Sequence, residues 1–95
     1  MVRAISRKAI REFGKLHADA APSLSNWLQI VRKAKWRNLA ELRADFAGAD
    51  QVGRRTVFNI GGNKYRLIAR VNYRSQRLFI LHTMKHAEYV KGEWK

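Results

Sequence analysis

The stretch of sequence that decides the fold is VFNIGGNKYRLIARV, residues 57–71, in which two apolar runs flank Gly61-Gly62-Asn63. Glycine and asparagine tolerate positive φ, so this stretch predicts a β-hairpin with its turn at these three residues. Successive side chains of a strand point to opposite faces of a sheet. The second run therefore predicts two faces, one formed by Tyr65, Leu67, Ala69 and Val71 and the other by Lys64, Arg66, Ile68 and Arg70. Cations along one face either prevent aggregation or bind a negatively charged partner.

Helical spacing dominates the residues before Gly53. Apolar residues recur there every three or four positions, which is typical of amphipathic helices. Ser6 is well placed to cap a first helix, Pro22 to begin a second and Asn38 to cap a third. Gly48 follows the third apolar stretch, and a glycine in this position commonly ends a helix. Most of the first half of the chain is thus predicted to be helical.

After Gly53 the chain instead contains β-branched and aromatic runs separated by turn residues. These runs predict strands at residues 56–60, 64–72 and 77–83, and residues 2–5 could add a fourth. A short helical turn is expected at residues 85–89. Helices followed by strands predict an α+β fold: a compact antiparallel sheet of three to four strands with the N-terminal helices packed on one face.

Length and cysteine content limit the class of protein. The 95 residues suit one domain, residues 1–95, and the absence of cysteine excludes disulfides and thiolate metal sites. No apolar run approaches the roughly 20 residues that cross a bilayer, and the N-terminus lacks a continuous signal-peptide core. We therefore expect a cytoplasmic protein without a membrane segment.

Net charge is the most informative part of the composition. Twenty Lys and Arg residues against seven Asp and Glu residues give a net charge of +13 and a pI near 11.2. Residues 1–50 contain 10 basic and 5 acidic side chains, and residues 51–95 contain 10 and 2. Such a field attracts polyanions, of which nucleic acid is the commonest. An acidic protein or an anionic membrane surface would fit the same charge.

The side chains of the second half also restrict the chemistry. Glu88 and Glu93 are its only carboxylates, which argues against a two-carboxylate glycosidase and against a metal nuclease with acidic ligands. His82 and His86 lack a third ligand for a metal ion. We therefore predict neither a metal ion nor a cofactor.

Cleavage of RNA without a metal ion is compatible with the Arg, Lys, His and Tyr residues that are present. The 2′-hydroxyl of ribose is an internal nucleophile, so the protein must help to move protons and to stabilise charge on the phosphorane. The planar guanidinium of arginine can hold phosphate oxygens bidentately. His, Lys or Tyr can transfer protons once neighbouring charges have shifted the pKa of the group.

Two segments carry a resemblance to a known family. Residues 57–66 read VFNIGGNKYR and residues 83–89 read TMKHAEY, on either side of a hydrophobic strand. This pattern resembles the HigB-type toxins of bacterial type II toxin–antitoxin modules, within the RelE-like superfamily. The resemblance covers nearly the whole chain and is strongest at the hairpin.

The resemblance implies a RelE-like fold and an activity. It implies a metal-independent endoribonuclease, an mRNA interferase, that cuts mRNA during translation on the ribosome. It also implies a bacterial cytoplasmic location and a cognate helix-turn-helix antitoxin of the HigA type, through which the complex would contact DNA.

The resemblance also implies site residues. The family's arginine in the middle strand falls on Arg66, where it would stabilise phosphate charge, and its C-terminal histidine and tyrosine fall on His86 and Tyr89, either of which would transfer protons. Strand geometry and charge, rather than motif identity, supply the other candidates. We predict catalytic residues Arg66, Lys85, His86 and Tyr89, and RNA-binding residues Asn63, Lys64, Arg70 and His82.

A non-catalytic RNA-binding module is the alternative function, because the same basic face could contact phosphates without cleaving the chain. Alternation assigns Tyr65 and Phe79 to the side that faces the helices. The charged face would then lack an aromatic platform for bases, which disfavours this alternative. A DNA-binding repressor is disfavoured because the sequence shows no convincing helix-turn-helix.

Overall fold

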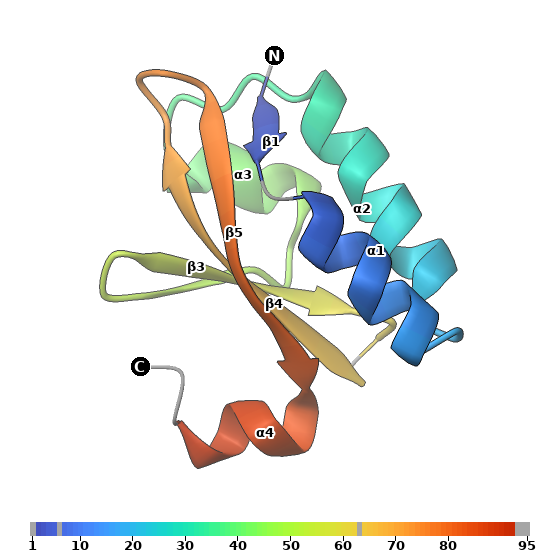
Figure 1. The fold of residues 1–95 in the computed structure, drawn as a ribbon. Helices are drawn as coiled ribbons and strands as arrows, with labels where there is room; N and C mark the ends of the chain where they lie inside the picture. The colour runs from blue at the N-terminus through green and yellow to red at the C-terminus, as the bar shows by residue number, and fades with distance from the viewer. Residues whose placement is uncertain (1, 6, 63, 93–95) are drawn as a thin grey trace.

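The structure of the chain is a computed structural model that describes residues 2–5, 7–62 and 64–92. The predicted cap Ser6 and the predicted RNA-binding residue Asn63 lie outside the described residues. In chain order the elements are β1 (Arg3–Ile5), α1 (Arg7–Leu16), α2 (Ala21–Lys33), α3 (Leu39–Asp45), β2 (Asp50–Val52), β3 (Arg55–Ile60), β4 (Tyr65–Asn72), β5 (Arg77–Lys85) and α4 (His86–Lys91). The helices α1 and α2 lie side by side against one face of the sheet, and α4 follows the last strand at one end of it (Figure 1).

The strands of the described chain form one sheet in the order β1-β5-β4-β3-β2. The predicted α+β class and both predicted hairpins are confirmed, but the sheet has five strands in place of three to four. It is also mixed rather than antiparallel, because β1 runs parallel to β5. The sequence missed β2, which is three residues long and is joined to β3 by the tight turn Gly53-Arg54, with Gly53 at a φ of 63°. So short a strand carries too little periodic signal to be predicted.

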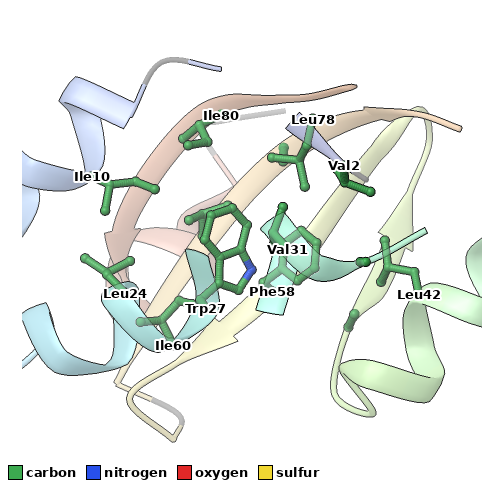
Figure 2. Packing of buried hydrophobic residues seen from close by; sticks show 14 of the residues in the cluster. Val2, Ile10, Leu24, Trp27, Val31, Leu42, Phe58, Ile60, Leu78 and Ile80 are labelled. Atoms are coloured by element: carbon green, nitrogen blue, oxygen red, sulfur yellow. The ribbon is translucent and has the colours of Figure 1, made fainter. Parts of the chain in front are cut away.

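The main hydrophobic core lies between the sheet and the helices. On α2, Leu24, Trp27 and Val31 recur at helical spacing and are buried, and Pro22 occupies the first turn as predicted. The ring of Trp27 meets Phe58 of β3 edge to face, with 5.4 Å between the ring centroids (Figure 2). Full burial of an apolar side chain of this size contributes about 1.5–3 kcal/mol. This core fixes which face of each strand points toward the helices.

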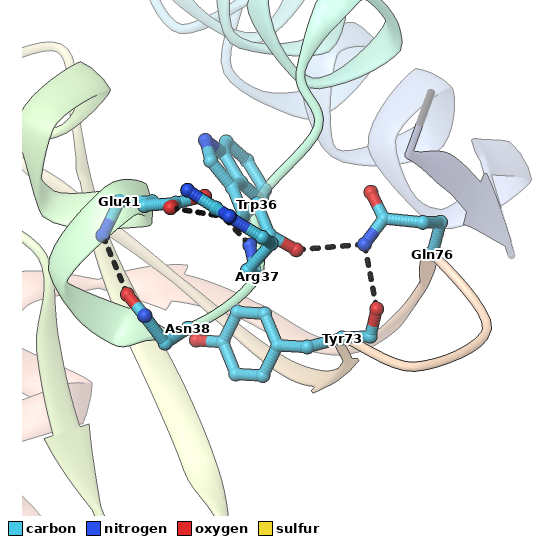
Figure 3. A network of polar contacts seen from close by, with 6 residues as sticks. All are labelled: Trp36, Arg37, Asn38, Glu41, Tyr73 and Gln76. Carbon is cyan, nitrogen blue, oxygen red and sulfur yellow. Dashed lines mark hydrogen bonds and ion pairs between the residues drawn. The ribbon is translucent and has the colours of Figure 1, made fainter.

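A polar network ties the start of α3 to the turn between β4 and β5 (Figure 3). Asn38 caps α3 as predicted, since its side-chain oxygen accepts a hydrogen bond of 3.0 Å from the backbone N–H of Glu41. The side-chain amide of Gln76 donates to the carbonyl oxygens of Trp36 at 2.7 Å and Tyr73 at 2.6 Å. Gln76 has a φ of 56°, a backbone conformation that residues other than glycine rarely adopt. The two hydrogen bonds of its side chain hold it in this turn.

A β-bulge in β5 decides which of its residues face outward. Ile68 of β4 pairs with His82, but Ala69 pairs with Ile80, so Leu81 is an extra residue on β5. Leu81 is 40% exposed. Because of the bulge, Ile80 packs in the core on the helix side while His82, only two residues later, lies on the other face.

We call the face of the sheet opposite α1 and α2 the open face. The strand register assigns to it Arg3, Ile5, Val52, Arg55, Val57, Asn59, Arg66, Ile68, Arg70, Asn72, Arg77, Phe79, His82 and Met84. Among the described strands, Asp50 of β2 is the one carboxylate on this face, opposite Val57. Basic side chains therefore gather on the face that the N-terminal helices leave uncovered.

Candidate nucleic-acid interface

Arg66 lies at the centre of the predicted site and is charged although only 8% of it is exposed. It is placed in β4 between Asn59 of β3 and Met84 of β5. Its Nη1 donates to the carbonyl oxygen of Tyr65 at 3.0 Å, and in the described part of the chain no carboxylate forms an ion pair with it. Most of the five N–H donors of the guanidinium can therefore serve a phosphate.

A second, small apolar cluster surrounds Arg66 on the open face. It consists of Val57, Ile68 and Met84, with Val52 and Tyr89 packed against it. The ring of Tyr89 lies over the guanidinium, with 5.6 Å between Cζ of Arg66 and the ring centroid, within the range of a cation–π interaction. Apolar surroundings lower the local dielectric and so strengthen any hydrogen bond from Arg66 to an anion.

The helix α4 carries both Tyr89 and His86. The backbone N–H of His86 donates to the carbonyl oxygen of Lys64 at 2.9 Å, which ties the start of α4 to the turn between β3 and β4. Gly92, at a φ of 73°, ends the helix. His86 is exposed and Tyr89 is half-buried, and their spacing of three residues places them on the same face of α4.

Arg70 and His82 also lie on the open face, and both are exposed. His82 pairs with Ile68 of the apolar cluster, whereas Arg70 is four residues beyond Arg66 along β4. At about 3.3 Å per residue, the two arginines are ~13 Å apart along the strand. The structure thus brings Arg66 and Tyr89 into contact, with His82 close to their apolar cluster, and places Arg70 further along the face.

Lys64 departs from the predicted face. It precedes β4, and its Nζ lies 3.8 Å from Oδ2 of Asp19, in the loop between α1 and α2. The hydroxyl of Tyr65 donates to Oδ1 of the same carboxylate at 2.7 Å. That hydrogen bond, with a smaller contribution from the ammonium of Lys64, holds the pKa of Asp19 below its ordinary value. The prediction that Lys64 shares a face with Arg66 is wrong, because its ammonium lies beside Asp19, the carboxylate that also bonds the helix-side residue Tyr65.

Lys85 also lies apart from Arg66. It is the last residue of β5 and pairs with Tyr65, whose side chain packs in the core on the helix side. Residues directly opposite one another share a face of the sheet, so the register turns Lys85 away from the face that carries Arg66 and Met84. The structure therefore does not bring Lys85 to the predicted catalytic group.

Phe79 faces the opposite way from the prediction. Simple alternation puts it toward the helices, but the bulge at Leu81 reverses the phase of β5. Phe79 pairs with Arg70 of β4 and with Ile5 of β1, so it lies on the open face. The prediction that the charged sheet face offers no aromatic side chain is therefore wrong. The sequence signal was the uninterrupted apolar run LFIL at residues 78–81, which strict alternation cannot place on one face.

The described residues contain no group of three His, Cys, Asp or Glu side chains close enough to hold a metal ion. No helix in the described ranges is both long and apolar enough to span a bilayer. A surface hollow of about 400 Å³ lies between α1 and α2, on the helix side, with Ile10, Leu24 and Leu28 in its wall. Among the side chains that the open face presents to a ligand are arginine, histidine and aromatic groups.

A small α+β domain with a nearly buried arginine on a basic sheet face has the features of a protein that acts on nucleic acid. Comparison with known families makes the class more specific. The model of the HigB_toxin family, a RelE-like toxic component of a toxin–antitoxin system, matches residues 20–92, which include both hairpins and α4. The chain belongs to this family, and the predicted resemblance is confirmed.

Individual relatives agree with the family assignment. The chain is 29% identical over 90 residues to the mRNA interferase HigB of Escherichia coli O6:H1, with 92% of this chain and 87% of that protein covered. It is 28% identical over 88 residues to the mRNA interferase toxin HigB of Escherichia coli K12, with 90% and 85% covered. The mRNA interferase HigB of Shigella flexneri matches to the same extent.

Proposed function

We propose that this toxin is a metal-independent endoribonuclease, an mRNA interferase, that cleaves mRNA during translation on the ribosome. The observation that carries the proposal is Arg66, a guanidinium only 8% exposed, without a carboxylate partner in the described chain and under the ring of Tyr89. A buried charge without an ion partner costs stability, so its presence is explained if an anion binds there. Relatives named as mRNA interferases support the same activity.

In the proposed reaction the 2′-oxygen of one nucleotide attacks the adjacent phosphorus, and the bond to the 5′-oxygen of the next nucleotide breaks. Arg66 donates hydrogen bonds to the non-bridging oxygens and stabilises the charge of the phosphorane. His86 and Tyr89 share a face of α4, and one of them accepts the proton of the 2′-hydroxyl or donates a proton to the leaving 5′-oxygen, while solvent water exchanges the other proton. The products carry a 2′,3′-cyclic phosphate and a free 5′-hydroxyl.

The remaining predicted residues fall into two groups in this proposal. Arg70 and His82 lie on the open face and position the RNA along β4 and β5. Lys64 and Lys85 are directed away from Arg66 and take no part in the chemical step. A role for Asn63 in the turn stays a prediction, because this residue lies outside the described chain.

We further propose that a cognate helix-turn-helix antitoxin of the HigA type neutralises the toxin in the bacterial cytoplasm and alone contacts DNA. The net charge of +13 favours association with a partner of opposite charge. Co-expression with the neighbouring reading frame tests this part of the proposal. Growth should be restored and the two proteins should purify together, whereas persistent growth arrest would reject that frame as the antitoxin.

The decisive experiment on the activity compares the wild type with the double variant Arg66→Ala, His86→Ala in a bacterial host. Growth is followed and mRNA 5′ ends are mapped, while circular dichroism of the purified proteins checks folding. We expect the wild type, and the control Arg32→Ala on the exposed side of α2, to arrest growth and to produce new 5′-hydroxyl ends. Full cleavage and toxicity in a folded double variant would overturn the assignment of the site. Growth arrest by the wild type without new mRNA ends would reject the nuclease.

A non-catalytic RNA-binding module is the second candidate, and one observation now favours it more than the sequence did. Phe79 lies on the open face beside Arg70, so this face does carry an aromatic side chain next to its cations. The two candidates differ in one measurement. A purified protein that binds RNA but leaves it intact, both alone and with translating ribosomes, would establish the binding module.

A further inference from the structure

The part of the open face beyond Arg66 is built around Phe79. This residue lies between Arg70 of β4 and Ile5 of β1. It is half-buried, and it belongs to neither of the two apolar clusters of the described chain. A partly exposed aromatic ring beside an arginine on a sheet surface is the arrangement on which single-stranded nucleic acids stack their bases.

The strand register places three arginines at positions near Phe79 on the open face. Arg70 is directly opposite Phe79, and Arg77, two residues earlier on β5, is in register with Arg3 of β1. All three are exposed, and none forms an ion pair within residues 2–5, 7–62 and 64–92. Like charges in register on neighbouring strands repel, so the pair of Arg3 and Arg77 favours an anion on this face. Phosphate groups supply that charge.

Phe79 lies on the same uninterrupted sheet face as the proposed cleavage site. Arg66, Ile68 and Arg70 alternate along the same face of β4, and Phe79 lies beside the last of them. Because Arg70 is four residues further along β4 than Arg66, the ring is ~13 Å along the strand from the phosphate that Arg66 would hold. An RNA strand bound at Arg66 and extended along β4 would therefore bring a flanking nucleotide to Phe79.

We propose that Phe79 stacks on a nucleobase of the single-stranded RNA substrate, at a nucleotide that flanks the cleaved bond, and that Arg70 and Arg77 bind the neighbouring phosphates. This inference rests on the proposed function and names a subsite of the same surface. Because every base has a π-face, the subsite adds affinity with little sequence preference. An acidic segment of a protein partner is the competing occupant. RNA is favoured because the ring shares one continuous face with Arg66.

The test measures binding of short 2′-O-methyl RNA, which lacks the free 2′-hydroxyl and cannot be cleaved by the proposed route. Dissociation constants are compared for the wild type, Phe79→Leu and Phe79→Tyr, using intact RNA and a series in which one abasic site is moved along the strand. Phe13→Leu, a half-buried aromatic residue on α1 on the other side of the sheet, is the matched control. Thermal unfolding checks each variant, and Phe79→Met replaces Phe79→Leu if the latter fails to fold.

We expect Phe79→Leu to weaken binding of intact RNA by roughly 5- to 150-fold, and both Phe79→Tyr and Phe13→Leu to bind within a few-fold of the wild type. An abasic site at one position of the RNA should weaken RNA binding by the wild type by a similar factor. It should not weaken RNA binding by Phe79→Leu any further, since the two changes remove the same contact.

Several results would overturn the inference. An unchanged dissociation constant for Phe79→Leu would do so, as would an abasic penalty that is the same in wild type and variant at every position. Unaltered RNA binding combined with loss of antitoxin binding would assign the surface to the protein partner instead. None of these results would contradict the proposed function, provided that the wild type cleaves mRNA and Arg66→Ala does not. A wild type that neither binds nor cleaves RNA would reject both proposals.

Discussion

The two ends of the open face hold the same kind of side chain in opposite environments. Arg66 is nearly buried, lies under Tyr89 and is surrounded by an apolar cluster. Arg70, four residues further along the same strand, is exposed beside the half-buried Phe79. The difference comes from α4, which follows β5 at the Arg66 end of the sheet (Figure 1). Tyr89 of this helix packs against the apolar cluster at that end.

This difference in environment separates two kinds of electrostatic effect. At the Arg66 end the dielectric is low, so hydrogen bonds to developing charge are strong and depend on geometry. At the Phe79 end solvent and salt screen the charges, which therefore contribute mainly to affinity. Substitutions at the first end should change the rate of cleavage, and substitutions at the second should change binding and its salt dependence.

The largest effect is expected where α4 meets the Arg66 end. We expect one of the two variants Tyr89→Phe and His86→Gln to lower the single-turnover cleavage rate by about 10²–10⁴-fold, the range of general acid–base catalysis. Tyr89→Phe keeps the ring over Arg66, so a lower cleavage rate in this variant would be due to the missing hydroxyl rather than to changed packing. The other variant should change the rate by less than about tenfold. If both variants change the cleavage rate only slightly, neither residue of α4 takes part in the chemical step.

The second prediction compares the two arginines of β4 directly. Arg66→Lys keeps the charge but loses the planar fork, and we expect the cleavage rate at saturating RNA to fall by about 10²–10³-fold, as when one donor to a developing oxyanion is removed. Arg70→Lys should raise the RNA concentration needed for half-maximal rate and leave the maximal rate within a few-fold. Equal losses of maximal rate in both variants would contradict the division of the face into two ends.

The hairpin on which this comparison depends could be predicted because local chemistry determines it. Gly61 and Gly62 adopt φ values of 62° and 69°, the positive region that the sequence of the turn predicts. The alternation of β4 is regular up to and beyond Leu67, which is fully buried in the helix-side core. The position of Arg66 on the open face follows from these two features alone.

The features that the sequence did not reveal depend on distant partners. Lys64 lies beside Asp19, and Tyr65 bonds the same carboxylate across a separation of 46 residues. The bulge at Leu81 and the parallel pairing of β1 are likewise set by packing rather than by local pattern. Because one extra residue exchanges the two faces of a strand, this single bulge moved Phe79 from the predicted core to the open face.

A smaller effect should appear in stability. The guanidinium of Arg66 is buried without a carboxylate partner in the described chain, so Arg66→Met should raise the free energy of unfolding by about 1 kcal/mol while abolishing cleavage. For a domain of this size, such a change raises the melting temperature by about 4–8 °C. Arg70 is exposed, so Arg70→Met should leave the melting temperature unchanged within error. Scanning calorimetry measures both, and a destabilised Arg66→Met would mean that the guanidinium supports the fold rather than a ligand.

The smallest expected effect is in the salt dependence of RNA binding. Each phosphate contact on single-stranded nucleic acid contributes about −0.7 to the slope of log K against log salt concentration. Arg70→Ala and Arg77→Ala should each reduce the steepness by about this amount, because each exposed guanidinium would release the counterions of one phosphate. Lys33→Ala, exposed at the end of α2, should leave the slope unchanged. Titrations of 2′-O-methyl RNA at several salt concentrations measure this slope. An equal change of slope in all three variants would mean that RNA binding depends only on the net charge of the protein and not on where the charges lie.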